Sequence, residues 1–557
     1  MNTTALSAQS AEARAGFRSA VLNFMTTPIF QKRFATIFFL CACLLAPCAR
    51  AEVHLASPFT SHMVLQRDMK APVWGTADAG ETVTVEFAGQ KISAQADADG
   101  NWRANFKPLK VSAEGRRLTV TGSHTAQPIT LDDVLVGEVW LASGQSNMDF
   151  SMSKKVKYFS GVTNEDQEIA AANYPLIRMF IGEASKAYKP QTNVTGVWKV
   201  CTPETAPAFC AIGYFFARDL QMEIKVPIGI IAEAFGASTA EAWIDRETMT
   251  ADPKLKPMLD RFDAAVENFR TNHPAVVAPP RSEDVTATNE AVTATNVASV
   301  GTTNSAPNRR RRGGGATRDP VQDQHNVTVL FNGMINPVIP YAIRGAVWYQ
   351  GESIIGGAEG IALYPHVEEA LIKDWRALWG EGNFPFYIVQ LPGQEASSNS
   401  PKVREAQALG LTLPNTGMAV TTDIGEAHNV HPKNKQDVGD RLSRIALANV
   451  YGRKMEFSGP MYQSMKVKGG TIRVKFSHLG GGLVAKGGEP LKWFVIAGAD
   501  KKFVPADAKI DGDTVVVSSP EVAAPVAVRY AWVNFPDGCN LFNAAGLPAA
   551  QFSTDKW

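Results

Sequence analysis

The sequence predicts an α/β domain flanked on both sides by β-rich segments, and three features of the chain lead to this prediction. Short runs in which apolar and polar residues alternate, separated by Gly and Asp turns, occupy residues 53 to about 133. The same alternation returns after Tyr451. Between these segments, continuous apolar runs typical of buried strands follow one another with stretches whose apolar residues recur every three to four positions. The middle of the chain is therefore expected to be a sheet covered by helices on both faces.

Length and composition are those of a multidomain globular protein. The chain has 557 residues, 45% of them apolar, and a formal net charge of +1. A chain of this size folds into about three or four domains. Its near-neutral charge argues against a nucleic-acid partner, because such proteins normally carry a basic surface. The four arginines at 309–312 lie in a polar tract and are interpreted as a solvated linker charge.

Residues 1–51 are interpreted as an N-terminal extension followed by a signal peptide. Lys32 and Arg33 precede a short apolar run, and the sequence ARA ending at Ala51 fits a signal-peptidase site. The run is too short for a comfortable transmembrane helix. We therefore expect cleavage after Ala51, a periplasmic or secreted protein, and no integral membrane segment after cleavage. A lipoprotein signal ending at Cys43 is the weaker alternative.

Cysteine usage agrees with export. Three of the six cysteines would leave with the signal peptide, and Cys201, Cys210 and Cys539 would remain. Cys201 and Cys210 could form a disulfide across a short loop, which would leave Cys539 free.

Residues 52–133 are predicted to form an N-terminal β-domain. TVTVEF at 82–87 and RLTVTG at 117–122 alternate as half-buried strands do, and ADADGNW at 96–102 supplies a turn between strands. DADG also resembles the start of a calcium loop. Pro108 stands where such a loop needs its bidentate glutamate, so a hairpin turn is predicted there instead.

Residues 134–454 form the predicted α/β domain, and residues 455–557 form the predicted C-terminal β-domain. The α/β domain carries a low-complexity insertion at about 274–326, rich in Ala, Thr, Asn, Pro and Gly. This tract has too few bulky apolar residues to join a core. In sheets of this class, ligands bind at the carboxyl ends of the strands. Candidate site residues are therefore sought just after the buried strands.

Ser146, within SGQSNM at 143–148, is the first such candidate. It follows the apolar run VGEVWLA and precedes a predicted helix, so a sharp turn would expose its hydroxyl together with backbone N–H groups. A serine in an ordinary turn has the same local sequence, and the motif is not the G-x-S-x-G elbow. Ser146 becomes a candidate nucleophile only through the motifs that accompany it.

Two further turns after buried strands carry suitable polar groups. FGASTAEAW at 235–243 offers the backbone N–H of Gly236, although a plain tight turn explains the same residues. VWYQGES at 347–353 places Gln350 and Glu352 where an amide donor and a carboxylate could converge on one site. A buried glutamine bonded within the core is the alternative reading of this stretch.

A candidate base lies in TTDIGEAHNVHPKNKQDVGDRL, residues 421–442. His431 precedes a proline and then a helical pattern with Val438 and Leu442 on one face, which places the histidine in a loop facing a cleft. A structural or solvated histidine is the alternative. His428 and His431 lack the spacing of metal ligands. We expect no metal or organic cofactor.

These motifs, together with SPFTSHMVLQRDMKAPVWGTADAG near the start and RYAWVNFPDGCNLFNAAGLPA near the end, resemble the sialate O-acetylesterase family. These are SGNH-type serine esterases, similar to bacterial plant-polysaccharide acetylesterases. The resemblance implies a flavodoxin-like SGNH hydrolase domain between β-sandwich or jelly-roll segments. It also implies removal of O-acetyl groups from carbohydrate, either sialic acid or a plant cell-wall glycan such as hemicellulose, with no obligate protein partner. A non-catalytic glycan-binding protein and an esterase of non-carbohydrate esters are the alternatives.

The resemblance also implies roles for individual residues. The family's nucleophile falls on Ser146 and its base on His431. The oxyanion donors fall on the backbone N–H groups of Ser146 and Gly236 and on the side-chain amide of Gln350.

The acid that orients the base is not given by the resemblance. SGNH enzymes commonly place an aspartate three residues before the histidine, and this chain has His428 there. We expect Asp423 to orient His431. Glu352, Glu426 and a backbone carbonyl are the alternatives.

Substrate contacts are predicted from aromatic residues beside the motifs. Trp243, Trp348 and Tyr349 are candidates for stacking on a sugar, and burial in the core is the alternative for all three. No basic cluster accompanies the motifs, which disfavours an anionic sugar. The sequence does not place Arg344 and Arg529 well enough to change that expectation.

Overall fold

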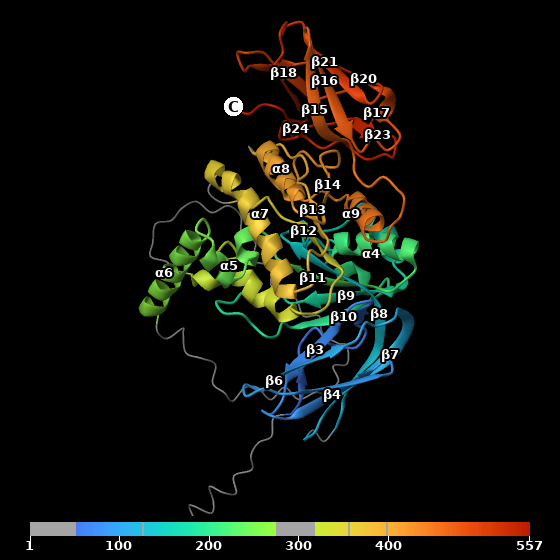
Figure 1. Cartoon of the computed structure of the whole chain (residues 1–557), viewed down its shortest axis with the longest axis vertical. Coiled ribbons are helices and arrows are strands. Elements are labelled where there is room, and N and C mark those ends of the chain that lie inside the picture. Colours follow the sequence, from blue (N-terminus) through green and yellow to red (C-terminus); the bar gives the residue numbers. More distant parts are fainter. Residues whose placement is uncertain (1–51, 125–126, 274–317, 355–356, 397–398) are drawn as a thin grey trace, which may run out of the picture. The chain divides into compact units, whose positions relative to one another are not determined.

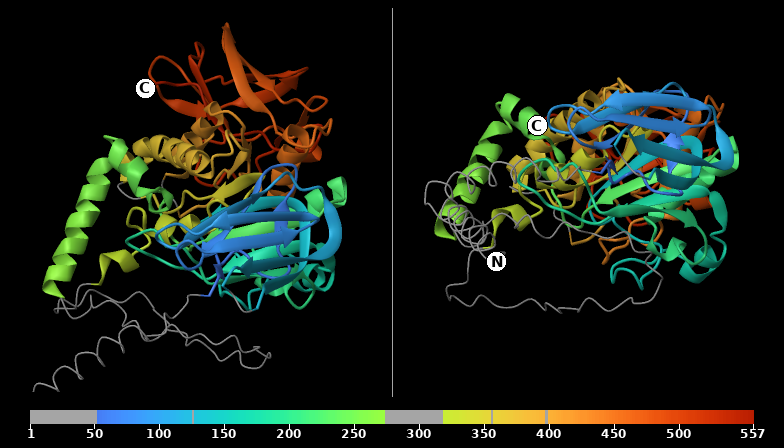
Figure 2. Two further views of the ribbon diagram at one scale, coloured as in Figure 1. Left: turned by 60° about the horizontal axis from the view of Figure 1, so that its bottom comes forward. Right: turned by 90° about the horizontal axis from the view of Figure 1, so that it is seen from below.

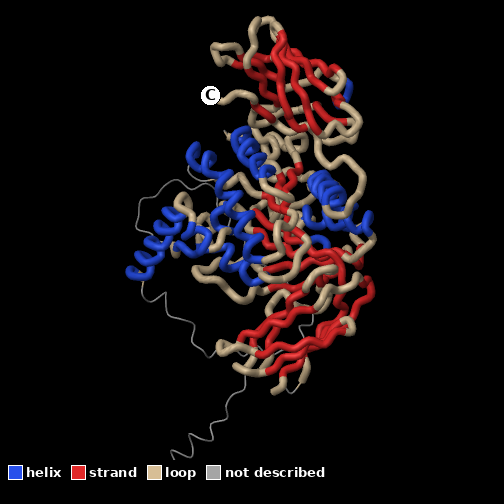
Figure 3. Tube along the Cα trace, in the orientation of Figure 1, coloured by secondary structure: helices blue, strands red, loops and turns tan. Residues whose placement is uncertain are grey.

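The computed structural model describes residues 52–124, 127–273, 318–354, 357–396 and 399–557. The predicted extension and signal peptide at 1–51, and residues 274–317 of the predicted insertion, lie outside the described residues. What is described is a mixed α/β structure with several sheets. Its α-helices lie between Glu165 and Asn449, and the segments before and after them consist mainly of strands (Figure 3).

The N-terminal strands follow the alternation of the sequence. In TVTVEF, for example, Val83, Val85 and Phe87 are buried while the residues between them are not. β1, β3 and β6 form a three-stranded antiparallel sheet, and β4 pairs with β5 and β7. These strands are β1 (His54–Leu55), β2 (Val64–Gln66), β3 (Ala71–Thr76), β4 (Thr82–Phe87), β5 (Gln90–Gln95), β6 (Asn101–Phe106) and β7 (Ser112–Gly122).

The central sheet has the order β10-β9-β11-β8-β12-β13-β14, and β10 is its antiparallel edge. After β8, the chain adds β9, β10 and β11 on one side of β8 in the sheet, and then β12, β13 and β14 on its other side. Strand order therefore reverses at β8, and the crevice outside the carboxyl end of such a strand is where α/β sheets bind ligands. The strands are β8 (Ile129–Gly144), β9 (Tyr174–Gly182), β10 (Gly196–Cys201), β11 (Ile228–Ala234), β12 (Gly345–Tyr349), β13 (Phe386–Val389) and β14 (Thr416–Ala419).

β8 belongs to both the N-terminal strands and the central sheet. Its first half pairs with β7 and β2, and its second half pairs in parallel with β11 and β12. The strand thus runs across the boundary expected between residues 133 and 134. The N-terminal strands and the central strands consequently lie side by side, as both views of Figure 2 show.

Helices cover both faces of the central sheet. Trp140 and Ala142 of β8 belong to the apolar core that includes residues of α4 and α9, whereas Val139 and Leu141 point to the other face and belong to the core that includes residues of α6 and α7. Figure 1 shows α4 and α7 on opposite sides of the central strands. The helices are α3 (Glu165–Ala170), α4 (Ala211–Ile224), α5 (Arg246–Ala251), α6 (Lys256–Asn272), α7 (Gly357–Trp379), α8 (Ser400–Ala408) and α9 (Gln436–Asn449). Within the described ranges, none of the helices combines the length and the apolar character needed to cross a membrane.

Single helical turns complete the connections. They are η1 (Ala206–Ala208), η2 (Ala240–Trp243), η4 (Pro320–Gln322), η5 (Phe331–Ile335), η6 (Asn336–Val338), η7 (Leu409–Thr412) and η8 (Lys486–Gly488).

The C-terminal strands have their own apolar core, which includes Ile472, Val474 and Val528. They form two four-stranded sheets, β15-β16-β21-β20 and β19-β18-β22-β24, and the pair β17-β23. The strands are β15 (Met461–Lys468), β16 (Thr471–Ser477), β17 (Leu483–Ala485), β18 (Phe494–Ala497), β19 (Phe503–Pro505), β20 (Asp507–Asp511), β21 (Thr514–Ser518), β22 (Ala527–Tyr530), β23 (Leu541–Asn543) and β24 (Phe552–Ser553).

The cysteines do not form the disulfide considered from the sequence. Cys201, Cys210 and Cys539 are all buried as free thiols. Cys210 instead caps α4, where its Sγ accepts a hydrogen bond from Gly213 N and donates one to Met148 O at 3.0 Å. Its thiol is thus used in local structure.

Candidate active site

A tight turn after β8 presents Ser146 at the carboxyl edge of the central sheet. Gly144 closes the strand with φ 141°, and a Cβ there would lie 2.2 Å from Tyr349 O, so only glycine fits. The next residue, Gln145, donates its N–H to Tyr349 O at 2.9 Å and accepts one from Met148 N at 2.8 Å. The turn is therefore fixed on both sides of Ser146, which is 8% exposed.

His431 lies against the Ser146 hydroxyl. It comes from the loop between β14 and α9, and its Nε2 is 2.8 Å from Ser146 Oγ. The side chain of Asn429 clamps this loop, because its Oδ1 accepts His431 N–H at 3.0 Å and its Nδ2 donates to His431 O at 2.8 Å. The ring of Phe159 packs on the imidazole with 4.8 Å between centroids. These contacts fix the position of the imidazole next to the serine.

The environment keeps this imidazole neutral. Burial, together with the positive charge of Lys435, lowers the pKa of His431 to about 4. Lys435 is itself 1% exposed, and burial lowers its pKa to about 7. At neutral pH the imidazole can therefore carry its proton on Nδ1 and accept the hydroxyl proton of Ser146 through Nε2, which is the requirement for a general base.

A buried polar network connects the serine turn to the histidine loop. Lys435 Nζ donates to Asn147 Oδ1 at 2.5 Å. The Nδ2 of the same Asn147 donates to Glu352 Oε1 at 2.5 Å and to Val430 O at 2.9 Å. Asn147 follows Ser146 and Val430 precedes His431, so one amide ties together the two segments that carry the reacting groups.

Glu352 belongs to this network through its hydrogen bond from Asn147. Burial raises the pKa of its carboxyl group, and the hydrogen bond from Asn147 counteracts that rise. Its Oε2 is buried and has no partner among the described residues. Glu352 and Val430 both line a cavity of about 190 Å³.

The structure does not support Asp423 as the orienting acid. Both of its carboxylate oxygens accept hydrogen bonds from the Arg441 guanidinium, each at 2.7 Å, and both side chains are buried. Glu426 accepts instead from Asn429 Nδ2 at 2.9 Å and from Lys433 N at 2.7 Å. Within the described part of the chain, neither these carboxylates nor Glu352 hydrogen-bonds to His431. His428, at the position the aspartate usually takes, is 85% exposed in its side chain.

The predicted oxyanion donors are only partly brought together. A Cβ on Gly236 would lie 3.8 Å from the Cβ of Ser146, so this backbone does lie beside the serine. Its N–H group faces the Asp149 carboxylate, where it opposes the rise in pKa that burial causes. Ser146 N–H donates to none of the described residues.

Gln350 is fully buried and its amide is engaged elsewhere. Its Nε2 donates to Gln145 Oε1 and to Ser238 O, both at 3.2 Å. In this state the side chain braces the loops behind Ser146 and offers no free N–H toward a substrate.

The three aromatic residues predicted to stack on a sugar belong to the core, which corrects the expectation for them. Trp243 and Trp348 are fully buried and meet edge to face at 6.0 Å, and Tyr349 is 1% exposed. The continuous apolar character of these strand ends reflects packing on both faces of the sheet. None of the three rings offers a face to a ligand.

Asn147, Lys435 and Phe159 are the site residues that sequence reasoning missed. Asn147 stands in the SGQSNM motif and Lys435 in HPKNKQDVGDRL, so both belong to motifs that predict the site. No local signal distinguishes an inward lysine from a solvated one, because a lysine at the start of an amphipathic helix is normally exposed. Phe159 comes from a loop with no motif at all.

A serine hydroxyl held against a neutral histidine, at the strand edge where an α/β sheet binds its ligand, is the arrangement used by serine hydrolases. Comparison with known proteins shows that the chain is similar to esterases. Residues 321–448 match the family described as carbohydrate esterase, sialic acid-specific acetylesterase.

Similar proteins cover nearly the whole chain. The sialate O-acetylesterases of Mus musculus and Homo sapiens are each 26% identical to it, over 89% of this chain and 93% and 91% of their own lengths. The crystal structure of a carbohydrate acetylesterase from Xanthomonas citri superposes with a TM-score of 0.74 and 34% identity, covering 91% of this chain and all of that one. The chain belongs to the sialate O-acetylesterase family of carbohydrate acetylesterases. The family predicted from the motifs and the carbohydrate O-acetylesterase activity are both confirmed.

Proposed function

We propose that this carbohydrate O-acetylesterase works by acyl transfer to Ser146, with His431 as the general base. The 2.8 Å contact between His431 Nε2 and Ser146 Oγ carries the proposal. The lowered pKa of His431 supports it, because a protonated imidazole could not accept the serine proton.

The reaction then proceeds in two steps. Ser146 Oγ attacks the acetyl carbonyl carbon while its proton moves to His431 Nε2. The tetrahedral intermediate collapses, the sugar oxygen leaves with the proton from Nε2, and the acetyl group remains on the serine. A water molecule, deprotonated by the same nitrogen, then attacks this ester and releases acetate and the free Ser146 hydroxyl.

The oxyanion of each intermediate would be held by backbone donors. The N–H of Ser146 is available for this role, and the N–H of Gly236 becomes available when it turns from Asp149 to the substrate. Gln350 would have to give up its bond to Gln145 or Ser238 to become a third donor. We therefore assign Gln350 a bracing role and leave the two backbone groups as the proposed donors.

The Asn147 network would replace an orienting carboxylate in part. It holds Val430, the residue before His431, at 2.9 Å and so fixes the histidine loop through its backbone. The Asn429 side chain bonds to the backbone N–H and C=O of His431 itself. Orientation by backbone contacts was one of the alternatives to Asp423.

The preferred substrate we propose is a neutral acetylated glycan of the hemicellulose type. The two arginines considered for an anionic sugar are already used, since Arg344 pairs with Glu138 at 2.7 Å and Arg529 binds both carboxylate oxygens of Asp555. The names of the mouse and human relatives support acetylated sialic acid as the second candidate.

We further propose that the catalytic part is a flavodoxin-like SGNH fold between β-sandwich segments, and that the protein is exported. The parallel strand order that reverses at β8 supports the first statement. The signal-like sequence before residue 52 supports the second.

Acetate release by the full chain tests substrate and mechanism together. We expect turnover of acetylated xylan and acetylated glucomannan that exceeds turnover of an O-acetylated sialoside, and no turnover by Ser146→Ala. A faster reaction with the sialoside would reverse the substrate order. Release of acetate by Ser146→Ala would remove the serine mechanism.

A further inference from the structure

A second cavity, of about 460 Å³, lies apart from the Ser146 site. One wall is the sheet β1-β3-β6, and the other comes from residues 192–193 and 336–340. Residues 336–340 lead into the amino end of β12, whereas Ser146 follows the carboxyl end of β8. Because β8 and β12 are parallel, the two sites lie at opposite ends of these strands. The volume is within the range of about 300–1,000 Å³ usual for small-molecule sites.

The sheet wall has two chemically different faces. Register pairs Trp74 with Arg103, and it pairs Thr76 with both Asn101 and His54. Directly paired residues of antiparallel strands share one face, so these five side chains line the cavity together. Val73 and Ala104, next to Trp74 and Arg103 along their strands, point the other way and are buried in the core.

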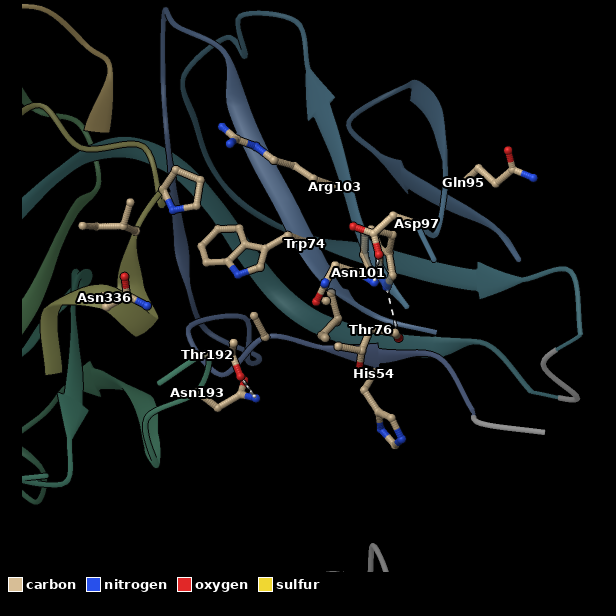
Figure 4. Close-up of a pocket in the computed structure, with 16 residues that line it drawn as sticks. His54, Trp74, Thr76, Gln95, Asp97, Asn101, Arg103, Thr192, Asn193 and Asn336 are labelled. Carbon is tan, nitrogen blue, oxygen red and sulfur yellow. Dashed lines mark hydrogen bonds between the residues drawn. The ribbon is translucent and has the colours of Figure 1, made fainter. Parts of the chain in front are cut away.

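Trp74 presents a fixed aromatic surface in this cavity. Its ring is half-buried and meets Phe59 edge to face with 4.6 Å between centroids, and it meets Tyr341 at 6.5 Å. Figure 4 shows the ring between Arg103 on the sheet and the side chains of Asn193 and Asn336 on the opposite wall. A held indole of this kind can stack on the C–H face of a pyranose without first losing rotamer freedom.

Hydrogen-bonding groups around the ring are unused. Four side-chain groups beside the cavity form no hydrogen bond with the protein in the described ranges, and all four are accessible to solvent. They are the guanidinium of Arg103, the amide of Asn101, the imidazole of His54 and Nε1 of Trp74. Asp97, by contrast, is used locally, because its Oδ1 accepts from Asn101 N at 2.8 Å and from Asp99 N at 3.0 Å. Free donors and acceptors around an aromatic platform match the hydroxyl pattern of a sugar.

We propose that this cavity, with Trp74 as its platform, is a non-catalytic binding site for a neutral glycosyl unit of the polysaccharide substrate. The proposal rests on the carbohydrate specificity proposed above. Occupation of the site would hold a polymer on the enzyme while another part of the chain reaches Ser146. Such tethering raises the effective concentration of acetyl groups for a polymer and not for a small ester.

The test measures binding separately from catalysis. Chemically deacetylated xylan and glucomannan oligosaccharides are titrated calorimetrically into the full chain carrying Ser146→Ala. The substitution removes turnover, and the deacetylated ligands carry no acetyl group for the active site to recognise. We expect binding, weakened at least about tenfold by Trp74→Ala and by Arg103→Ala and less by Trp74→Phe. Trp493→Ala and Lys107→Ala, which change an exposed indole and an exposed cation elsewhere, should leave affinity unchanged.

Two results would overturn the proposal. One is the absence of binding of either oligosaccharide by the parent protein, which would leave the cavity to another occupant such as a segment of this chain or a second copy. The other is equal affinity of the parent, Trp74→Ala and Arg103→Ala.

A kinetic arm in the active enzyme keeps the proposal falsifiable if Trp74→Ala fails to fold. There Arg103→Ala should raise KM for the acetylated polymer and leave kcat and KM for 4-nitrophenyl acetate unchanged. A parent that releases acetate from neither polymer would refute the proposed function, while the binding arm would still decide the cavity.

Discussion

Lys435 and Arg404 are both cations buried in the interior, and the two regions around them differ in how that charge is used. Arg404 lies in α8 against the C-terminal strands. Its Nε donates to Gln551 Oε1 at 2.6 Å, and its Nη2 donates to Val533 O at 2.5 Å. Three further backbone carbonyls lie within 3.5 Å of its guanidinium. Burial lowers the pKa of Arg404 to about 9, so the group remains charged at neutral pH.

Lys435 has far fewer partners. Among the described residues its one hydrogen-bond acceptor is Asn147 Oδ1, and it also faces the rings of Phe150 at 4.5 Å and Tyr349 at 5.6 Å. The carboxylates of Glu352 and Glu426 favour its charged form, yet burial still lowers its pKa to about 7. A buried charge that is only partly compensated costs stability, and such charges collect at functional sites. The comparison indicates that Arg404 serves the fold, whereas Lys435 serves the chemistry of the neighbouring His431.

The largest effect should come from Ser146→Ala. Losing the nucleophile should lower kcat for a small acetyl ester by about 10⁴-fold or more, with an unchanged melting temperature, because the hydroxyl contributes chemistry and no packing. Ser143→Ala is the matched control, since its hydroxyl is buried and, unlike that of Ser146, has no hydrogen-bond partner among the described residues. Near-normal turnover by Ser146→Ala, or equal loss in both variants, would contradict the assignment.

His431→Ala should lose as much activity as Ser146→Ala, because residues that act as one unit lose activity together. His428→Ala should stay active, since that side chain is 85% exposed and pairs with Glu395, away from Ser146. Initial rates with the same ester decide between them. An inactive His428→Ala beside an active His431→Ala would reassign the base.

Sequence reasoning could find the serine and the histidine because each stands in a motif at the end of a recognisable apolar pattern. Ser146 follows a continuous buried run, and His431 precedes the helical period of Val438 and Leu442, and both patterns are dictated by burial. The mixed α/β class follows from the same periods. Such patterns report which elements form and roughly where each ends.

The partners of each side chain depend on three-dimensional packing, which these patterns do not contain. Asp423 precedes His431 in the same segment and is the orienting acid expected from the sequence, yet Arg441, on the next helix, binds both of its oxygens. Trp348 and Trp243 stand beside site motifs and still point into the core. Periodicity predicts the burial of a strand, but which of its two faces meets a helix and which meets a ligand is decided by tertiary contacts.

Lys435→Met should change the pH dependence of turnover. In the parent, kcat/KM should fall as the pH drops through about 4, where His431 gains a proton and stops acting as a base. At that pH Lys435 is charged and holds the pKa of His431 down. Removing its charge should therefore move the acid limb upward, toward the ordinary histidine value of 6.5.

Lys433→Met is the matched control for this shift. Lys433 lies two residues away and is exposed, so the same loss of charge should leave the acid limb in place. A limb that stays near 4 in Lys435→Met would show that burial alone depresses the pKa of His431. Lys435 would then have no effect on the pKa of His431, and the functional role that distinguishes it from Arg404 would be lost.

Asp423→Asn should alter kcat by less than about threefold while lowering the melting temperature. Its carboxylate belongs to a buried pair with Arg441, and removing one charge of such a pair costs about 3–5 kcal/mol of stability. Asp437→Asn is the control, because Asp437 also faces Arg441 but at 4.0 Å and with a half-exposed side chain. A fall in kcat of about 10²-fold or more at an unchanged melting temperature would restore Asp423 as the orienting acid.

The smallest effect on kcat, and the largest on stability, is expected for Arg404→Met. The substitution leaves buried carbonyl groups of the C-terminal strands and Gln551 without a donor, and each unsatisfied group costs about 1–3 kcal/mol. The free energy of unfolding measured in urea should fall by several such increments, whereas the remaining folded protein should keep the kcat and the acid limb of the parent. Lys402→Met, on the exposed face of the same helix, should change neither quantity. If Arg404→Met instead lowered kcat at full stability, the junction between α8 and the C-terminal strands would be coupled to the Ser146 site. Both buried cations would then serve the reaction, and the number of partners around a buried charge would no longer distinguish a structural role from a functional one in this protein.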